Sequence, residues 1–422
     1  MSRSSKSRSP KCSFCANQQT KGIKIIQGPK DVHICSECIS LSLDMIRNPS
    51  NHNNSQLNSD GELPTPKQIK AHLDQYVIGQ HQAKKRLSVA VYNHYKRLEN
   101  VRLIEEKQEE VEIQKSNLLL IGPTGTGKTL MAQTLAKFLN VPFAVADATT
   151  LTEAGYVGED VENIVLNLYR AANENIEQTI RGIVFVDEID KLAKKGASGS
   201  TSRDVSGEGV QQALLKIIEG TLANLQSKEN KRGGQQQPKQ VDTTHILFIC
   251  GGAFEGLDKI IEQRTGKGRI GFSNEELEDQ EAYEERLMKD VSPEDLEKFG
   301  LIPEFVGRLP VIAVMEHLEE EQLVEILTQP KNALVKQYQK LFIDEDITLT
   351  FTEPALQAIA RKAVDRKAGA RGLRTILEEI MLDIMYDAPS QKDLKEVIIE
   401  EACVLEGAQP KCIFDQPIGI PS

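Results

Sequence analysis

The stretch SNLLLIGPTGTGKTLMAQTLAKF, residues 116–138, decides the fold of this 422-residue chain. An apolar run, a glycine-rich turn and an amphipathic segment follow one another, which predicts a strand, a loop and a helix. The turn GPTGTGKT, Gly122–Thr129, fits the phosphate-binding pattern G-x-x-x-x-G-K-[ST]. Backbone N–H groups would hold the phosphates, Lys128 would reach the β and γ groups, and Thr129 would bind Mg²⁺. A chance glycine-rich turn is the alternative, and the flanking strand and helix argue against it.

A second apolar run, RGIVFVDEID at 181–190, ends in acidic residues. A strand ending in Asp187 and Glu188 places one carboxylate to hold Mg²⁺ and a second to polarise the attacking water. On their own, acids after a strand are commonly just solvated. Because they stand about sixty residues after a phosphate-binding loop, they predict a domain that hydrolyses ATP or GTP.

Further strands and helices alternate around these two motifs. Buried-strand runs occur at 141–150 and 245–252, and helical spacing of apolar residues at 160–175 and 209–220. The fold class is therefore α/β, with a parallel sheet covered by helices on both faces. A small, mainly helical α+β domain should follow it, with helices at 353–367 and 371–387 and strands at 347–351 and 396–405.

Composition restricts the function. The net charge of −11, the absence of Trp and an aromatic content of 5% argue against nucleic acid as the main partner. No apolar run approaches a membrane span, and the basic start MSRSSKSRSPK has no apolar region behind it, so we expect a cytoplasmic protein without a membrane partner. There is no G-x-S-x-G, and none of the seven His residues precedes Glu, so the chain should not cleave peptide bonds itself.

Four of the seven cysteines form two C-x-x-C pairs, Cys12 with Cys15 and Cys35 with Cys38. This spacing is typical of a structural zinc site, which a segment of about forty residues needs because its own core is small. Disulfides are disfavoured in a cytoplasmic chain, and a redox dithiol is the other alternative. The remaining thiols, which should be buried or inert, are Cys250, Cys403 and Cys412.

These pieces, in this order, resemble the ClpX family, the ATP-dependent protein unfoldases of the AAA+ class that feed the ClpP peptidase. The resemblance runs from Cys12 to about Leu405. It implies a homohexamer that binds ATP, Mg²⁺ and structural Zn²⁺, unfolds tagged proteins and moves them through a central pore into ClpP. The zinc-binding domain would dimerise and receive substrates and adaptors. The related unfoldase HslU lacks the cysteine module and is disfavoured.

The resemblance and the composition together divide the chain into six segments. They are a disordered tail at 1–11, a zinc-binding domain at 12–48, a linker at 49–66, a large AAA+ domain at 67–314, a small AAA+ domain at 315–405 and a C-terminal tail at 406–422.

The resemblance also implies nucleotide-binding residues outside the two motifs. In LDQYVIGQ, Val77 and Ile78 would lie against the adenine. GLIPEFVGR ends in Arg308, an arginine finger for the ATP of a neighbouring subunit, and GARGLR contains Arg371, which would contact the nucleotide in cis. Each arginine could otherwise be a surface or salt-bridged residue. Within the loop motif, the residues expected at ATP are Pro123, Thr124, Gly125, Thr126, Gly127, Lys128, Thr129 and Leu130.

Two segments resemble pore loops. In TEAGYVGED at 152–160, Tyr156 and Val157 stand between glycines, where a bulky and sterically general contact could grip any polypeptide. Otherwise Tyr156 would be a loop anchor on its own domain. TSRDVSGEG resembles a second pore loop near Arg203. At the pore entrance, NKRGGQQQPK keeps Lys231 and Arg232 but lacks the His that some relatives have.

A third segment, RIGFSN at 269–274, resembles the loop by which the family docks into hydrophobic pockets on ClpP. Ile270, Gly271 and Phe272 would be the anchor, unless the long polar loop folds back and buries them. Two other function classes remain as alternatives. One is a nucleic-acid remodelling ATPase of the same superfamily, and the other is an ATP-regulated scaffold that does no mechanical work.

Overall fold

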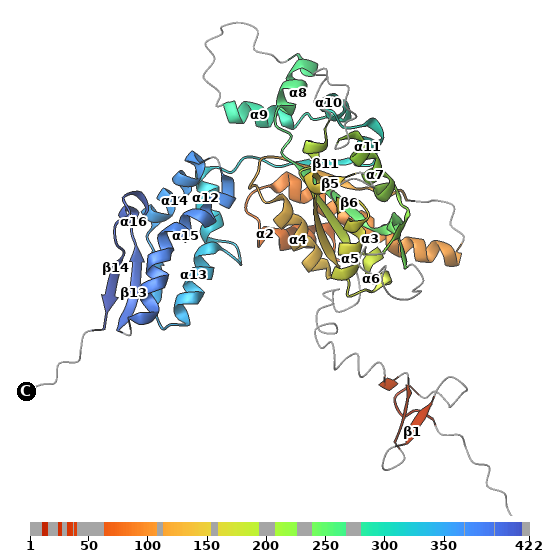
Figure 1. The fold of residues 1–422 in the computed structure, drawn as a ribbon, viewed down its shortest axis with the longest axis horizontal. Helices are drawn as coiled ribbons and strands as arrows, with labels where there is room; N and C mark the ends of the chain where they lie inside the picture. Colours follow the sequence, from red (N-terminus) through yellow and green to blue (C-terminus); the bar gives the residue numbers. More distant parts are fainter. Residues whose placement is uncertain are drawn as a thin grey trace, which may run out of the picture. The chain divides into compact units, whose positions relative to one another are not determined.

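The computed structural model describes residues 11–15, 24–27, 32–36, 38–39, 63–107, 113–152, 159–193, 207–225, 239–266, 280–366, 368–391 and 393–415 (Figure 1). Contacts divide the chain into two compact units, Met1–Glu62 and Leu63–Ser422. Among the described helices, none combines the length and the apolarity that crossing a membrane requires.

The second unit contains a five-stranded sheet, in which every neighbouring pair of strands is parallel. Its order is β11-β3-β10-β7-β4. The strands are β3 (Leu118–Ile121), β4 (Phe143–Asp147), β7 (Ile183–Asp187), β10 (Leu247–Gly252) and β11 (Val311–Val314). Because β10 lies between β3 and β7, the carboxyl ends of these three strands meet at one edge, where open α/β sheets bind their ligands.

Helices cover both faces of this sheet, as the apolar runs predicted. Alternate residues of β3 enter opposite cores: Leu118 and Leu120 face one side, and Leu119 and Ile121 the other. The first core includes α2 (Pro66–Asp74), α3 (His81–Lys107) and α4 (Lys128–Leu139). The second includes α5 (Asn163–Ala171), α7 (Glu208–Glu219), α8 (Leu257–Thr265), α10 (Pro293–Phe299) and α11 (Pro303–Gly307). Strands buried on both faces read as continuous apolar runs, which is why they were recognisable.

Short elements connect these layers. They are η3 (Ala148–Thr150), α6 (Ile176–Ile180), η4 (Ile189–Leu192), η6 (Thr243–His245) and α9 (Gln280–Met288). Two two-stranded pairs are also present: β5 (Leu151–Thr152) runs parallel to β6 (Glu159–Asp160), and β8 (Leu222–Asn224) runs antiparallel to β9 (Gln240–Asp242).

The rest of the second unit forms a small α+β domain with its own core. Its elements are α12 (Glu320–Thr328), α13 (Leu334–Ile343), β12 (Thr348–Phe351), α14 (Glu353–Asp365), α15 (Gly369–Asp387), η7 (Ala388–Ser390), β13 (Leu394–Ile399), α16 (Glu401–Leu405) and β14 (Lys411–Phe414). The strand order is β12-β13-β14, with β12 parallel and β14 antiparallel to β13.

The small domain differs from the sequence-based expectation in two places. The strand expected at 396–405 ends at Ile399, and 401–405 forms the helix α16, which begins after Glu400 in an extended conformation. β14 lies within the segment 406–422 that was expected to be a C-terminal tail, so the small sheet continues beyond residue 405. Its four exposed residues are too few to produce a visible alternation.

The first unit contains a two-stranded antiparallel sheet, β1 (Ile25–Gln27) and β2 (His33–Cys35), with Ile26 opposite Ile34. Elsewhere in the chain, Cys250 and Cys403 are buried as expected, whereas Cys412 is exposed. Burial raises the pKa of the Cys250 thiol to about 12, so this thiol is inert at neutral pH.

Candidate functional site

The phosphate-binding loop joins β3 to α4. Gly127, the N-cap of α4, has a φ of +96°, a left-handed conformation that glycine adopts without strain. The Lys128 side chain is buried and donates hydrogen bonds to the carbonyl oxygens of Gly122 at 2.7 Å and Pro123 at 2.9 Å. Burial lowers the pKa of Lys128, and the nearby Asp187 carboxylate opposes this shift. A buried cation is thus held beside the N-terminus of a helix, where anions bind.

The predicted acidic residues face this loop from β7. Thr129 Oγ1 donates to Asp187 Oδ2 at 3.1 Å, so the two groups expected to share Mg²⁺ lie together. The backbone N–H of Glu188 donates to Asp187 Oδ1 at 2.9 Å. Glu188 has a φ of +57°, in the left-handed region. Non-glycine residues rarely adopt this conformation, and those that do cluster at functional sites.

Two glycines at the end of β10 leave room for the side chains of Phe185 and Asp190 to pack against this strand. A Cβ atom on Gly251 would lie 2.7 Å from the Phe185 ring, and one on Gly252 would lie 2.6 Å from Asp190 Oδ1. Asp190 is buried and accepts a hydrogen bond from the backbone N–H of Ala253 at 3.2 Å. Asp190 and both glycines were not predicted from the sequence. A Gly-Gly pair that closes a buried strand was the signal that could have identified them.

A cavity of about 320 Å³ gathers most of the predicted nucleotide residues. Those residues are Thr124, Gly125, Gly127, Lys128, Thr129, Leu130, Asp187, Glu188 and Arg371. They come from the loop, from the end of β7 and from the first turn of α15 in the small domain. The lining residues that were not predicted are Asp190, Lys191, Ala253, Glu255 and Ala370.

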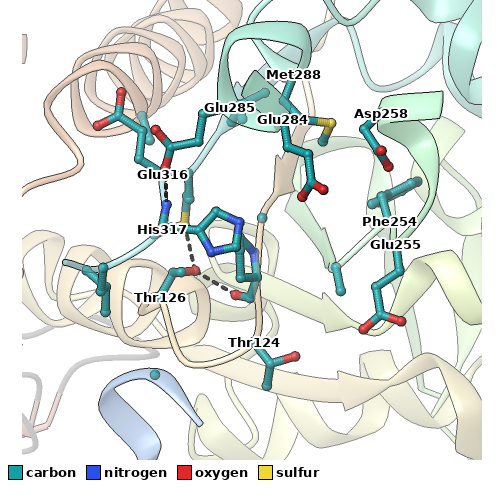
Figure 2. Close-up of a pocket in the computed structure, with 18 of the residues that line it drawn as sticks. Thr124, Thr126, Phe254, Glu255, Asp258, Glu284, Glu285, Met288, Glu316 and His317 are labelled. Atoms are coloured by element: carbon teal, nitrogen blue, oxygen red, sulfur yellow. Dashed lines mark hydrogen bonds between the residues drawn. The ribbon is translucent and has the colours of Figure 1, made fainter. Parts of the chain in front are cut away.

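A second cavity, of about 1220 Å³, adjoins the same loop (Figure 2). It is lined by Pro123, Thr124 and Thr126, and also by the acidic side chains of Glu255, Asp258, Glu284, Glu285 and Glu316. Figure 2 shows these carboxylates on several walls of the cavity. This cavity is larger, but neither Lys128 nor Asp187 lines it. Because Lys128, Thr129 and Asp187 line only the smaller of the two cavities, that cavity is the one whose residues suit phosphates and their cation.

The small domain touches the loop directly. A Cβ atom on Gly125 would lie 2.9 Å from the carbonyl oxygen of Ala368, and one on Gly369 would lie 3.0 Å from that of Thr124. The Arg371 cation contributes to the lowered pKa of Lys128, after burial. The position of Arg371 is therefore tied to that of the loop.

The segment with Val77 and Ile78 connects α2 to α3. Its anchor is Lys84, which is almost fully buried, pairs with Asp74 at 2.8 Å and donates to the carbonyl oxygen of Val77. Val77 is buried, and its Cγ1 lies 3.9 Å from the position of a Cβ on Gly127. Neither Val77 nor Ile78 is among the described residues that line the two cavities.

Arg308 lies near the amino ends of the strands, at the end of the sheet opposite to the phosphate-binding loop. It follows α11 and precedes β11, whose first residue, Val311, pairs in parallel with Leu118 at the start of β3. The side chain of Asn117, just before β3, donates from Nδ2 to the carbonyl oxygen of Arg308 at 3.1 Å. The phosphate-binding loop follows the other end of β3. At about 3.3 Å per residue, the four residues of β3 separate the two edges by roughly 13 Å. Arg308 is not among the residues that line the phosphate cavity.

The N-terminal cysteines form a second site. The four Sγ atoms of Cys12, Cys15, Cys35 and Cys38 lie within 4.8 Å of one another. The backbone N–H of Cys35 donates to Cys12 Sγ at 3.3 Å, and that of Cys38 donates to Cys35 Sγ at 3.5 Å.

The pKa values of two of these thiols shift in opposite directions, because one sulfur accepts backbone hydrogen bonds and the other contacts neighbouring sulfurs. Burial opposes the charged form of Cys12, but hydrogen bonds from the backbone of Cys15, Phe14 and Cys35 lower its pKa to about 6. Hydrogen bonds with the sulfurs of Cys15 and Cys35 raise the pKa of Cys38 to about 12. Four thiolates this close need a cation, and four sulfur ligands without an open position suit structural zinc.

Several predicted site residues lie outside the described residues. They are Tyr156, Val157, Arg203, Lys231, Arg232, Ile270, Gly271 and Phe272.

Comparisons with known proteins identify three regions of the chain. The model of the ClpX C4-type zinc finger matches residues 10–48, that of the AAA domain (Cdc48 subfamily) matches residues 113–312, and that of the C-terminal D2-small domain of ClpB protein matches residues 318–400. The ATP-dependent Clp protease ATP-binding subunit ClpX of Treponema denticola is 51% identical over 393 residues, which cover 93% of each chain. The chain therefore belongs to the ClpX family, with an AAA+ ATPase domain, a small C-terminal domain and an N-terminal zinc-binding module.

Proposed function

We propose that this chain works as a homohexameric ring that unfolds tagged proteins and moves them through a central pore into ClpP. As a member of the ClpX family, it is an ATPase and an unfoldase subunit of a Clp protease. The observation that supports the ring best is the position of Arg308. Its backbone lies at the end of β3 remote from its own phosphate-binding loop, which supports contact with ATP in another subunit.

In this proposal, each nucleotide site has contributions from two subunits. The loop amides and Lys128 bind the β- and γ-phosphates, and Val77 and Ile78 contact the adenine. Thr129 and Asp187, 3.1 Å apart, would hold Mg²⁺, which neutralises charge on the phosphates when bound. Glu188 orients the attacking water, and Arg308 from the neighbouring subunit stabilises charge on the transferred phosphoryl group.

The small domain would convert nucleotide state into motion. Arg371 lines the phosphate cavity, and Gly369 lies against Thr124 of the loop. The segment that contains Val77 and Ile78 is also hydrogen-bonded to residues that follow β11. Gln80 exchanges two hydrogen bonds with the backbone of Glu316, and the Gln75 carbonyl accepts from the Lys331 N–H at 3.0 Å. A nucleotide that binds these groups would therefore favour one angle between the two domains.

The zinc-binding module and three loops would contact partners. Phe14 is 69% exposed and Ile26 is 58% exposed, which supports dimerisation of the module or capture of substrates and adaptors. Ile270, Gly271 and Phe272 would dock on ClpP. Arg203, Lys231 and Arg232 would line the path of the substrate together with Tyr156 and Val157. The proposal is tested by following the fluorescence of a tagged fluorescent protein with this chain, ATP and ClpP.

The strands β5 and β6 flank the predicted first pore loop and pair with each other, Leu151 with Glu159 and Thr152 with Asp160. Tyr156→Ala should therefore leave the nucleotide site intact, with ATP turnover within about twofold of wild type. The same change should slow unfolding of a tagged fluorescent protein by roughly tenfold or more, because the bulky contact with the substrate is lost.

The matched control is Tyr156→Phe, which keeps the bulk of the ring and should unfold the substrate like wild type. If Tyr156→Ala unfolds the substrate normally, or if it loses ATP turnover in parallel, Tyr156 is an anchor of its own domain rather than a contact with the substrate.

A further inference from the structure

Glu219, the last residue of α7, holds the side chain of Arg308. Its Oε1 atom accepts a hydrogen bond from Nε of the guanidinium at 2.8 Å and forms an ion pair with Nη2 at 2.8 Å. The Arg308 side chain is 55% exposed and that of Glu219 is 38% exposed. The two residues are 89 positions apart in the sequence, so this contact depends on how α7 and α11 pack together.

Both ends of this ion pair rest on the segment immediately before β3. Asn117 is buried and donates from Nδ2 to the Arg308 carbonyl oxygen at 3.1 Å, while its Oδ1 accepts from the Phe248 N–H at 3.2 Å. Two residues earlier, Lys115 Nζ donates to the carbonyl oxygen of Ile218 at 3.0 Å and so fixes the last turn of α7. The backbones of Arg308 and of the last turn of α7 are thus both hydrogen-bonded to the short segment that precedes β3.

The geometry leaves one side of the guanidinium available. Glu219 occupies the Nε and Nη2 edge, and Nη1 has no hydrogen-bond partner among the described residues. An arginine side chain without such a contact samples many rotamers, and ordering it at a phosphate costs free energy at the moment of reaction.

We propose that Glu219 is a positioning residue that pre-orders Arg308, so that the Nη1 side faces the ATP of the neighbouring subunit. This inference rests on the proposed action of Arg308 in trans. Glu219 touches neither the nucleotide nor the water, and it acts only through Arg308. The pair is exposed, so it contributes little to folding stability, and its effect should be seen in turnover.

The experiment compares Glu219→Gln in the wild-type chain and in the Arg308→Ala chain, both as assembled rings. In the wild-type chain we expect kcat for ATP to fall roughly five- to tenfold, with KM within about twofold, because the groups proposed to bind ATP, Lys128, Thr129 and Asp187, are unchanged. In the Arg308→Ala chain, Glu219→Gln should cause no further fall. Glu219→Asp keeps the charge and should recover part of the lost turnover. Glu297→Gln, an exposed change on α10, should behave like wild type.

Three outcomes would overturn the inference. The first is wild-type or raised kcat in Glu219→Gln, which would mean that the pair is idle or withholds Arg308. The second is an equal fall in both chains, together with a lowered melting temperature, which would indicate a structural role. The third is wild-type turnover in Arg308→Ala alone, which would also remove the proposed function of Arg308. The first two outcomes leave that function intact.

Discussion

Glu188→Gln should bind ATP like the wild-type chain but turn it over about a hundredfold more slowly, or worse. The backbone of Glu188 is in a left-handed conformation at the end of β7, and its N–H bonds to Asp187, so the side chain is directed from a fixed turn into the phosphate cavity. Glutamine keeps the size and the hydrogen-bonding ability of this side chain but cannot accept a proton from water. Binding should survive because Lys128, Thr129 and Asp187 are unchanged.

Turnover is measured by phosphate release, and binding by displacement of a fluorescent nucleotide. Glu177→Gln, an exposed change in the first turn of α6, is the matched control and should keep wild-type values. If Glu188→Gln keeps its turnover, another group positions the water. Asp190, which lines the same cavity, would be the next candidate.

Arg308→Ala should lower ATP turnover by roughly a hundred- to a thousandfold, because a fixed cation that stabilises the transition state is lost. Rings assembled from two different variants test whether Arg308 acts on the ATP of a neighbouring subunit. A ring made from Arg308→Ala and Glu188→Gln subunits contains some sites with an intact Glu188 and a neighbour with an intact Arg308. With random mixing in equal amounts this holds for about one site in four, so turnover should recover to roughly a quarter of the wild-type value.

The control mixes Arg308→Ala subunits with subunits that carry both changes. No site in those rings has both groups, so turnover should stay at the level of the separate variants. If the complementary mixture also fails to recover, or if Arg308→Ala alone is fully active, then Arg308 does not act across a subunit boundary.

The phosphate-binding loop and the Asp187-Glu188 pair could be predicted because their chemistry is local in the sequence. A loop that holds phosphates needs glycines and a lysine at fixed spacing. The roles of Gly251 and Gly252 could not be predicted in this way. They depend on how closely β10 approaches Phe185 and Asp190, and this is a property of the packed sheet.

The position of Arg308 in the fold could not be predicted from the sequence either. Its motif indicated an arginine finger only by resemblance, and only the parallel register of β11 with β3 shows that it stands at the far edge of the sheet. Lys84 is a further example, because lysines are expected at the surface, yet this one is almost fully buried and anchors the segment with Val77. The helix α16 and the strand β14 were missed because each has only a few residues and no clear periodicity.

The most direct measurement follows a fluorescent protein that carries a C-terminal degradation tag. It is incubated with this chain, ATP and a cognate ClpP, and fluorescence and ATP hydrolysis are recorded together. We expect fluorescence to be lost only when all three are present, and to persist with Glu188→Gln or with a slowly hydrolysed ATP analogue. Persistent fluorescence while the wild-type chain hydrolyses ATP in the presence of ClpP would contradict the proposal that this ATPase unfolds proteins for the peptidase.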